Sequence, residues 1–293
     1  MRPLHFLFTL MLVVVWGCNF VAMREALGEI PPFTLCLLRL GLAAIPAVFF
    51  VRRPALPWRS IVIYGASMFL LQFTLIFFGL NLGMSAGLMS VCVQVHVFYT
   101  IGLAAVFLGE RAARFQIAGA VLAFFGLLYI GLHTGGDVTL PGMACGLLAS
   151  LSWAVGNVYS KRMPKVDMFA MVVWGSLICL PPLFALALII DGPTRMASSL
   201  TGMTWRGAGA VAYLVYPATL VGFSFWSWLI ARYPTATVAP MTLMLPVIGF
   251  AASAAVFGEA IEPWKIVATL LVISGLCVNM FGPRLLMLLP RRR

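Results

Sequence analysis

A few polar side chains stand inside long apolar runs of this sequence, and two of them, Arg39 and His96, can carry charge. In a hydrocarbon environment such a group needs a partner or a water-filled cavity, so it indicates a functional site. The guanidinium of Arg39 suits a carboxylate ligand, and the imidazole of His96 suits hydrogen bonding or proton transfer near neutral pH. The alternative for each is structural, with the side chain bonded to helix-end carbonyls or to a neighbouring helix.

Amides and tryptophans complete the candidate binding site. Asn19 and Asn157 each follow a tryptophan closely, Trp16 and Trp153, while Gln72 lies within another apolar run. Each amide can face a cavity or join two helices, and each tryptophan can line a pathway or face the membrane interface. Gln94 and His96 are two positions apart, and side chains two apart on a helix point in nearly opposite directions. Gln94 therefore cannot share the face of His96 and is not included in the candidate site. The predicted substrate-binding residues are Asn19, Arg39, Gln72, His96, Trp153, Asn157, Trp174 and Trp226.

Two prolines six positions apart, Pro240 and Pro246, interrupt one apolar run. Each removes a backbone donor and bends its helix. Interruptions of this kind often mark a gate or a binding site near the middle of the membrane, so both residues are predicted to act in gating. The alternative is a static kink.

The elements that must position these residues are membrane helices. The chain of 293 residues is 62% hydrophobic and 9% charged, with a mean hydropathy of +1.05, whereas a soluble domain carries about 25% charged residues. A spanning helix needs about 20 mostly apolar residues. We therefore predict an all-α integral membrane protein with ten spans and short connections, which leave no room for a soluble catalytic domain. The spans lie near 4–23, 31–51, 60–80, 84–108, 114–132, 140–160, 167–190, 205–230, 235–257 and 263–282.

The second half of the chain repeats the first. Gly109-Glu110 recurs as Gly258-Glu259 at an offset of 149, and Phe33 recurs as Phe169 at an offset of 136. The predicted units are residues 1–135 and 136–293, with five spans each. Because five is odd, the two copies must face opposite ways. An inverted repeat is typical of transporters that alternate between inward-open and outward-open shapes.

The basic residues predict the orientation. Of the nineteen lysines and arginines, only Arg24, Arg195, Arg206 and Lys265 fall on the side opposite the N-terminus, and Arg39 lies within a span. This bias predicts cytoplasmic N- and C-termini. The net charge of +11 then reflects topology and contact with anionic lipids, not nucleic-acid binding. The three histidines are far apart and the six cysteines are unpaired in spacing, so neither a metal nor another cofactor is predicted.

Several motifs together resemble the EamA family of the drug/metabolite transporter superfamily. They are Trp16-Gly17-Cys18-Asn19 in the first span, Leu38-Arg39-Leu40 in the second, the two Gly-Glu corners, and Val238-Ala239-Pro240 with Leu245-Pro246-Val247. The resemblance covers nearly the whole chain and implies two inverted five-helix halves that export amino acids and related metabolites. Within that family the chain is similar to exporters of O-acetylserine and cysteine. It differs from them at Gln94-Val95-His96, where that type carries Gln-x-Gln.

The expected function is a bacterial inner-membrane secondary transporter that exports amino acids or related small metabolites of the cysteine and O-acetylserine type by alternating access. The alternatives are a multidrug or aromatic-compound exporter and a membrane enzyme acting on a lipid-linked substrate. The absence of a phosphate-binding glycine loop or a nucleophile elbow argues against an enzyme. The expected partners are the small-molecule substrate and membrane lipids, and the oligomeric state stays open.

Overall fold

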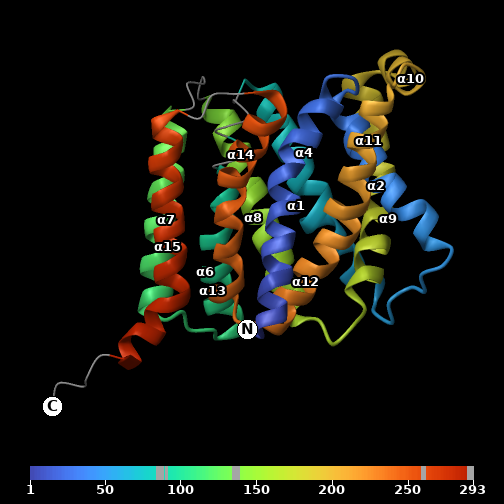
Figure 1. Cartoon of the computed structure of the whole chain (residues 1–293). Helices are drawn as coiled ribbons and strands as arrows, with labels where there is room; N and C mark the ends of the chain where they lie inside the picture. The colour runs from blue at the N-terminus through green and yellow to red at the C-terminus, as the bar shows by residue number, and fades with distance from the viewer. Residues whose placement is uncertain (84–88, 90–91, 134–138, 259–261, 289–293) are drawn as a thin grey trace.

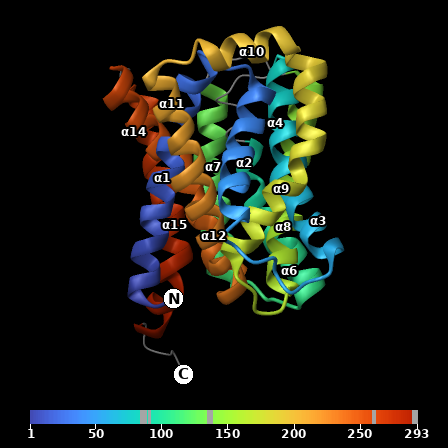
Figure 2. The same cartoon turned by 90° about the vertical axis from the view of Figure 1, so that its right-hand side faces the viewer.

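The computed structural model is a helical bundle in which the N-terminus and the end of α15 lie at one end and α10 lies at the other (Figures 1 and 2). It describes residues 1–83, 89, 92–133, 139–258 and 262–288. The start of the predicted span 84–108, the boundary between the predicted repeats and Glu259 lie outside the described residues. The elements are α1 (Pro3–Leu27), α2 (Pro32–Val48), α3 (Trp58–Gly65), η1 (Ala66–Leu70), α4 (Leu71–Asn81), α6 (His96–Leu108), α7 (Arg114–His133), α8 (Leu140–Arg162), α9 (Met168–Leu186), η2 (Ala187–Asp191), α10 (Pro193–Thr201), α11 (Trp205–Tyr213), η3 (Leu214–Val221), α12 (Gly222–Arg232), α13 (Thr235–Val238), η4 (Ala239–Met244), α14 (Leu245–Phe257) and α15 (Pro263–Leu288).

Several helices are long and apolar enough to cross a membrane. Within the described part of the chain, five stretches meet both criteria: Pro3–Leu27, Trp58–Asn81, Met168–Asp191, Trp205–Arg232 and Thr235–Phe257. Shorter apolar helices cover Pro32–Val48, Cys92–Leu108, Arg114–Gly126 and Ile266–Asn279. Large apolar side chains such as Val106 and Phe125 are exposed on the outside of the bundle. That distribution fits lipid as the surrounding solvent.

The internal repeat is visible in the backbone. Two π-helical segments, η1 and η3, interrupt the third and eighth predicted spans at matching positions. Gly109 and Gly258, also at matching positions, end their helices with φ of 66° and 68°, a left-handed conformation that favours glycine. α1 and α8 run in opposite directions, because α1 begins at the end of the bundle where α8 finishes. His5 near the start of α1 and Lys161 near the end of α8 both bond to Tyr233.

Carboxylates cap helices that belong to the other half of the chain. Glu29, after α1, accepts hydrogen bonds from the backbone and hydroxyl of Thr204 at the start of α11. These bonds lower the pKa of Glu29. Asp191, at the end of η2, accepts from the backbone and hydroxyl of Thr34 in the first turn of α2, at 2.6 and 2.7 Å. A carboxylate at a helix start satisfies free N–H groups and complements the helix dipole.

A third cap closes the end of the bundle that carries the termini. Glu110, after α6, accepts from the backbone N–H of Thr235 at the start of α13 and forms an ion pair with Lys161 of α8. Lys161 also donates to the Tyr233 carbonyl at 2.6 Å. Partial burial acts to raise the pKa of Glu110, but the hydrogen bonds from Lys161 and Thr235 and the charge of Lys161 outweigh it and lower that pKa. The two halves are therefore joined at this end by an ionised carboxylate.

One helix pair lies at one side of the bundle. α7 and α15 pack along each other at one side (Figure 1). Gly119 and Gly275 make this contact so close that a Cβ on either would lie 2.4 Å from backbone atoms of the opposite helix. Small residues of this kind let membrane helices approach closely. The pair therefore braces the bundle away from the helices that contribute the cavity described below.

We predict that Glu110→Gln lowers the thermal stability of the purified protein, because the charge-assisted bonds to Lys161 and Thr235 weaken. The loss should be about 1–2 kcal/mol, modest because the pair is partly exposed. Since the folded-state pKa of Glu110 is lowered, this contribution is complete above the unfolded-state pKa and disappears as the pH falls through the folded-state value. Thermal unfolding in detergent at neutral and acidic pH measures both effects.

Glu25→Gln, near the opposite end of α1, is the matched control and should leave the melting temperature unchanged. A double-mutant cycle with Lys161→Met isolates the pair. Strictly additive effects of the two changes would contradict an interaction between Glu110 and Lys161.

Candidate functional site

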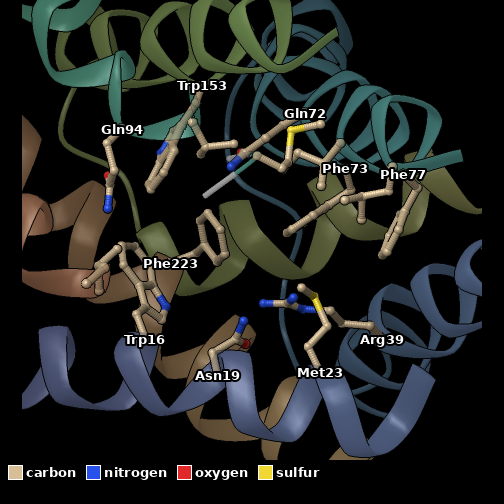
Figure 3. A pocket seen from close by; sticks show the side chains of 15 residues that line it. Trp16, Asn19, Met23, Arg39, Gln72, Phe73, Phe77, Gln94, Trp153 and Phe223 are labelled. Carbon is tan, nitrogen blue, oxygen red and sulfur yellow. The ribbon is translucent and has the colours of Figure 1, made fainter. Parts of the chain in front are cut away.

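A cavity of about 130 Å³ lies between helices of both halves (Figure 3). Met23 and Leu80 come from the last turns of α1 and α4, so the cavity lies toward the end of the bundle opposite the termini. Its lining comprises Trp16, Asn19, Met23, Arg39, Gln72, Phe73, Ile76, Phe77, Leu80, Met89, Val93, Gln94, Trp153, Phe223 and Leu245. The wall is thus mainly apolar, with a small number of polar groups, which is the usual composition of a small-molecule site.

Among the described residues that line the cavity, Arg39 alone is charged, and it is 6% exposed. Its Nε donates to the hydroxyl of Thr219 at 2.6 Å. Its guanidinium lies over the ring of Phe73, 4.7 Å from the centroid, where the negative face of the ring attracts a cation. These two contacts fix the plane of the guanidinium. Such a fork is suited to binding a carboxylate through two hydrogen bonds.

The π-helical segment η3 supplies the partners that hold the cavity wall in place. Thr219, within η3, donates its hydroxyl to the Leu214 carbonyl five residues earlier and so presents its oxygen to Arg39. The indole of Trp16 donates to the Ala218 carbonyl at 2.8 Å. Gly222 leaves room for this indole, since a Cβ there would lie 2.5 Å from its nitrogen. π-Helical turns are rare and frequently occur at functional sites.

An aromatic layer, defined as Trp16, Trp153, Phe223 and Trp226, closes the inner side of the cavity. The ring centroids of Trp16 lie 5.8 Å from Trp153, 5.0 Å from Phe223 and 5.5 Å from Trp226. Rings at these separations attract one another beyond their buried area. Because Trp16 comes from the first half and the other three from the second, the layer lies where the halves meet.

The broken helix α13–η4–α14 holds Gln94. Pro246 has no N–H, so the α-helical bond to the Thr242 carbonyl four residues earlier cannot form. That carbonyl instead accepts the Leu245 N–H in the tighter 3₁₀ pattern and the Gln94 side-chain nitrogen, the latter at 2.8 Å. Gln94 therefore turns its amide oxygen away from Thr242. Pro240 stands at the start of the same 3₁₀ segment.

The structure brings some of the predicted residues to the cavity and places others behind it. Asn19, Arg39, Gln72 and Trp153 line it. His96 instead stacks on Trp153, with centroids 3.8 Å apart, and lies 3.3 Å from the Thr242 hydroxyl. Asn157 accepts from the Trp226 indole at 2.7 Å and donates to Thr100, behind the aromatic layer.

Trp174 lies elsewhere. Its indole donates to the Val51 carbonyl at 3.2 Å, and its ring packs against Trp58 at 5.9 Å. Val51 belongs to the connection after α2 and Trp58 begins α3, on the side of the termini. Pro240 and Pro246 stand at helix interruptions, as their types require, but neither lines the cavity.

Sequence reasoning left Trp16, Gln94 and Phe223 out of the candidate set, although all three line the cavity. The helical rule that separates Gln94 from His96 was correct, and it favoured the residue that faces away from the cavity. Pro246 was the sequence feature that could have indicated Gln94. It leaves the Thr242 carbonyl without its helical donor, so another side chain can donate to that carbonyl. Trp16 closely precedes Asn19 as Trp153 closely precedes Asn157, and that recurrence could have added it.

The sequence of this chain is similar to those of known proteins. The EamA-like transporter family matches residues 4–132 and 140–281. A protein of Escherichia coli (strain K12) named as a probable amino-acid metabolite efflux pump is 38% identical over 281 residues, which cover 94% of each chain. The Salmonella typhimurium protein of the same name is 36% identical over the same share of both chains.

A more distant relative is the probable terminal-alkyne amino-acid exporter of Streptantibioticus cattleyicolor. It is 27% identical over 90% of this chain and 89% of its own. One crystal structure shares the fold with a TM-score of 0.77 at 20% identity, over 98% of this chain and 99% of the other. The fold is therefore one already seen by experiment.

Gln72 generates a prediction about stability. Its side chain is 3% exposed and its Oε1 has no hydrogen-bond partner, a state that costs about 1–3 kcal/mol. We therefore expect Gln72→Met to keep or raise the melting temperature of the empty protein. Gln116→Met is the matched control, because Gln116 accepts from Ala113 and donates to Thr237, and it should lower the melting temperature. A clear loss of stability in Gln72→Met would contradict the unpaired state of its oxygen.

Proposed function

Because the chain belongs to the EamA-like transporter family, we propose that it exports small amino acids or closely related metabolites by alternating access. The names of the Escherichia coli and Salmonella relatives support amino-acid metabolites as the substrate class. The observation that carries the proposal is the buried guanidinium of Arg39 in a small, mainly apolar cavity between the two halves. Membership of a transporter family also replaces the enzyme hypothesis.

The proposed topology is ten spans in two inverted units, residues 1–135 and 136–293, in the bacterial inner membrane with both termini in the cytoplasm. The paired interruptions η1 and η3 and the opposed directions of α1 and α8 support the inversion. Most basic residues lie in the terminal segments and in the connections on the same side as the N-terminus, and this bias supports the orientation. The cavity then lies toward the periplasmic side.

The proposed binding residues fall into two groups. Asn19, Arg39, Gln72 and Trp153 contact the substrate, with Arg39 receiving its carboxylate. Trp226 belongs to the aromatic layer, His96 and Asn157 support that layer from behind, and Trp174 belongs to a separate contact. Pro240 and Pro246 act in gating, since the 3₁₀ segment between them carries the carbonyl that holds Gln94.

The size of the cavity favours small substrates. Its volume of about 130 Å³ is well below the roughly 300–1,000 Å³ of sites for drug-sized ligands. This favours the proposed cysteine and O-acetylserine type over a multidrug substrate. An aromatic amino acid is the alternative substrate, and its ring would stack on the aromatic layer.

Counterflow in liposomes that contain only the purified protein tests the proposal. The liposomes are preloaded with unlabelled cysteine, O-acetylserine, threonine or phenylalanine, and uptake of the labelled compound is followed. Accumulation with one or more of them supports amino-acid transport and names the substrate. No accumulation for any, from protein shown to be folded, would overturn the proposed substrate class.

We predict that Arg39→Met lowers counterflow by about tenfold or more, because the carboxylate loses a charged partner. The matched control is Arg53→Met, since Arg53 also lies over an aromatic ring, that of Trp58 at 4.8 Å, but outside the cavity. The control should transport like the wild type. Equal activity of the two variants, at equal amounts of inserted protein, would contradict substrate binding by Arg39.

His96→Gln is expected to retain transport with an altered preference among the four substrates. His96 contacts Trp153 and Thr242 but does not line the cavity, so its replacement shifts the aromatic layer without removing a ligand. The ratio of counterflow rates for threonine and phenylalanine measures the change. Complete loss of transport in the folded variant would favour a proton-linked role instead.

A further inference from the structure

The cavity concentrates the unpaired polar atoms of the protein. Among the described residues, six buried side-chain nitrogen or oxygen atoms have no hydrogen-bond partner. Four of them belong to residues that line the cavity: Asn19 Oδ1, Gln72 Oε1, Gln94 Oε1 and Trp153 Nε1. Folded proteins leave few such atoms, and each costs stability. Their concentration at one place indicates groups kept for a ligand that enters.

Among these four atoms, the hydrogen-bonding role is defined best at Gln94. Its Nε2 donates to the Thr242 carbonyl at 2.8 Å, which cannot accept from an amide oxygen, so Oε1 must be the free end. Gln94 is therefore a fixed acceptor. The amides of Asn19 and Gln72 can present either face, whereas the indole of Trp153 can only donate.

Charge is distributed unevenly across the cavity. Arg39 and Gln94 enter it from opposite sides, with Asn19 beside Arg39 and Trp153 on the side of Gln94 (Figure 3). Arg39 supplies one positive charge, and no carboxylate is found among the lining residues that the structure describes. The rings of Trp16, Trp153 and Phe223 also line the cavity, and the faces of such rings attract a cation without carrying charge.

Resting on the proposed function, we propose that the cavity binds its substrate as a zwitterion in one orientation, with the carboxylate on Arg39 and the α-ammonium on Gln94 Oε1 against the aromatic rings. The indole of Trp153 then donates to an oxygen of a short side chain, such as a hydroxyl or ester. An ammonium has three donors and no acceptor, so it matches a fixed acceptor better than any neutral group does. The two ends of the substrate are thus read by opposite walls.

Counterflow competition with two analogues tests this orientation. Starting from the substrate with the strongest counterflow among cysteine, O-acetylserine, threonine and phenylalanine, one analogue replaces the carboxylate by a carboxamide and the other acetylates the amine. Competition by each analogue should be weaker than competition by the parent compound by about tenfold or more. This comparison uses the wild-type protein and does not depend on any variant folding.

Two variants then assign each end to its wall. Gln94→Met should weaken discrimination against the N-acetyl analogue and keep discrimination against the carboxamide. Arg39→Met should do the reverse, measured as binding competition if its transport is too slow. A merely structural role of either residue would lower both preferences together, so the crossed pattern is specific to contact with the ligand.

The outcomes separate this inference from the proposed function. Counterflow with equal competition by the parent compound and the N-acetyl analogue would overturn the zwitterion site while leaving amino-acid transport intact. Loss of both preferences together in Gln94→Met would overturn its assignment to the ammonium. Absence of counterflow for all four compounds would remove the proposed function itself.

Discussion

A lone guanidinium buried in an apolar bundle is the constraint on which the centre of this structure depends. Burying an unpaired charge in a membrane is costly, and Arg39 meets that cost with a neutral hydroxyl and an aromatic face instead of a carboxylate. The hydroxyl of Thr219 is available because η3 departs from regular α-helix. The same π-helical segment accepts the Trp16 indole at the Ala218 carbonyl, and Gly222 just after it leaves room for that indole, so one segment holds both Arg39 and the aromatic layer.

The architecture could be predicted from the sequence to a large extent, whereas the cavity could be predicted only in part. Composition and hydrophobic run length gave helices where they occur, because lipid requires each span to satisfy its own backbone. Arg39, Asn19, Gln72 and Trp153 were found because polar groups within apolar runs are few. Which side of a helix faces the cavity depends on packing between distant segments, so His96 and Gln94 could not be ranked correctly. Trp174 shows the same limit, since its partner Val51 lies 123 positions away.

The symmetry of the backbone is not matched by the chemistry of the side chains. At the offsets of the repeat, Arg39 corresponds to Gly175, and Gln72 and Gln94 correspond to Val221 and Leu243. The first half therefore contributes the polar groups of the cavity, while the second half contributes Trp153 and Phe223. The two similar units share the same interruptions of their helices, but they contribute different side chains to the cavity. The polar side chains of the cavity therefore come mainly from one unit, while both units supply aromatic rings.

The exchange of helix caps between the halves bears on how the chain assembles as it is synthesised. The start of α2 is capped by Asp191, 157 positions further along the chain, and the starts of α11 and α13 are capped by Glu29 and Glu110 from the first half. While the ribosome is still translating the second half, the N–H groups at the start of α2 have no such partner and must be satisfied by water or lipid headgroups. The first unit therefore enters the bilayer with an unfinished helix end, and the late-arriving carboxylate completes it.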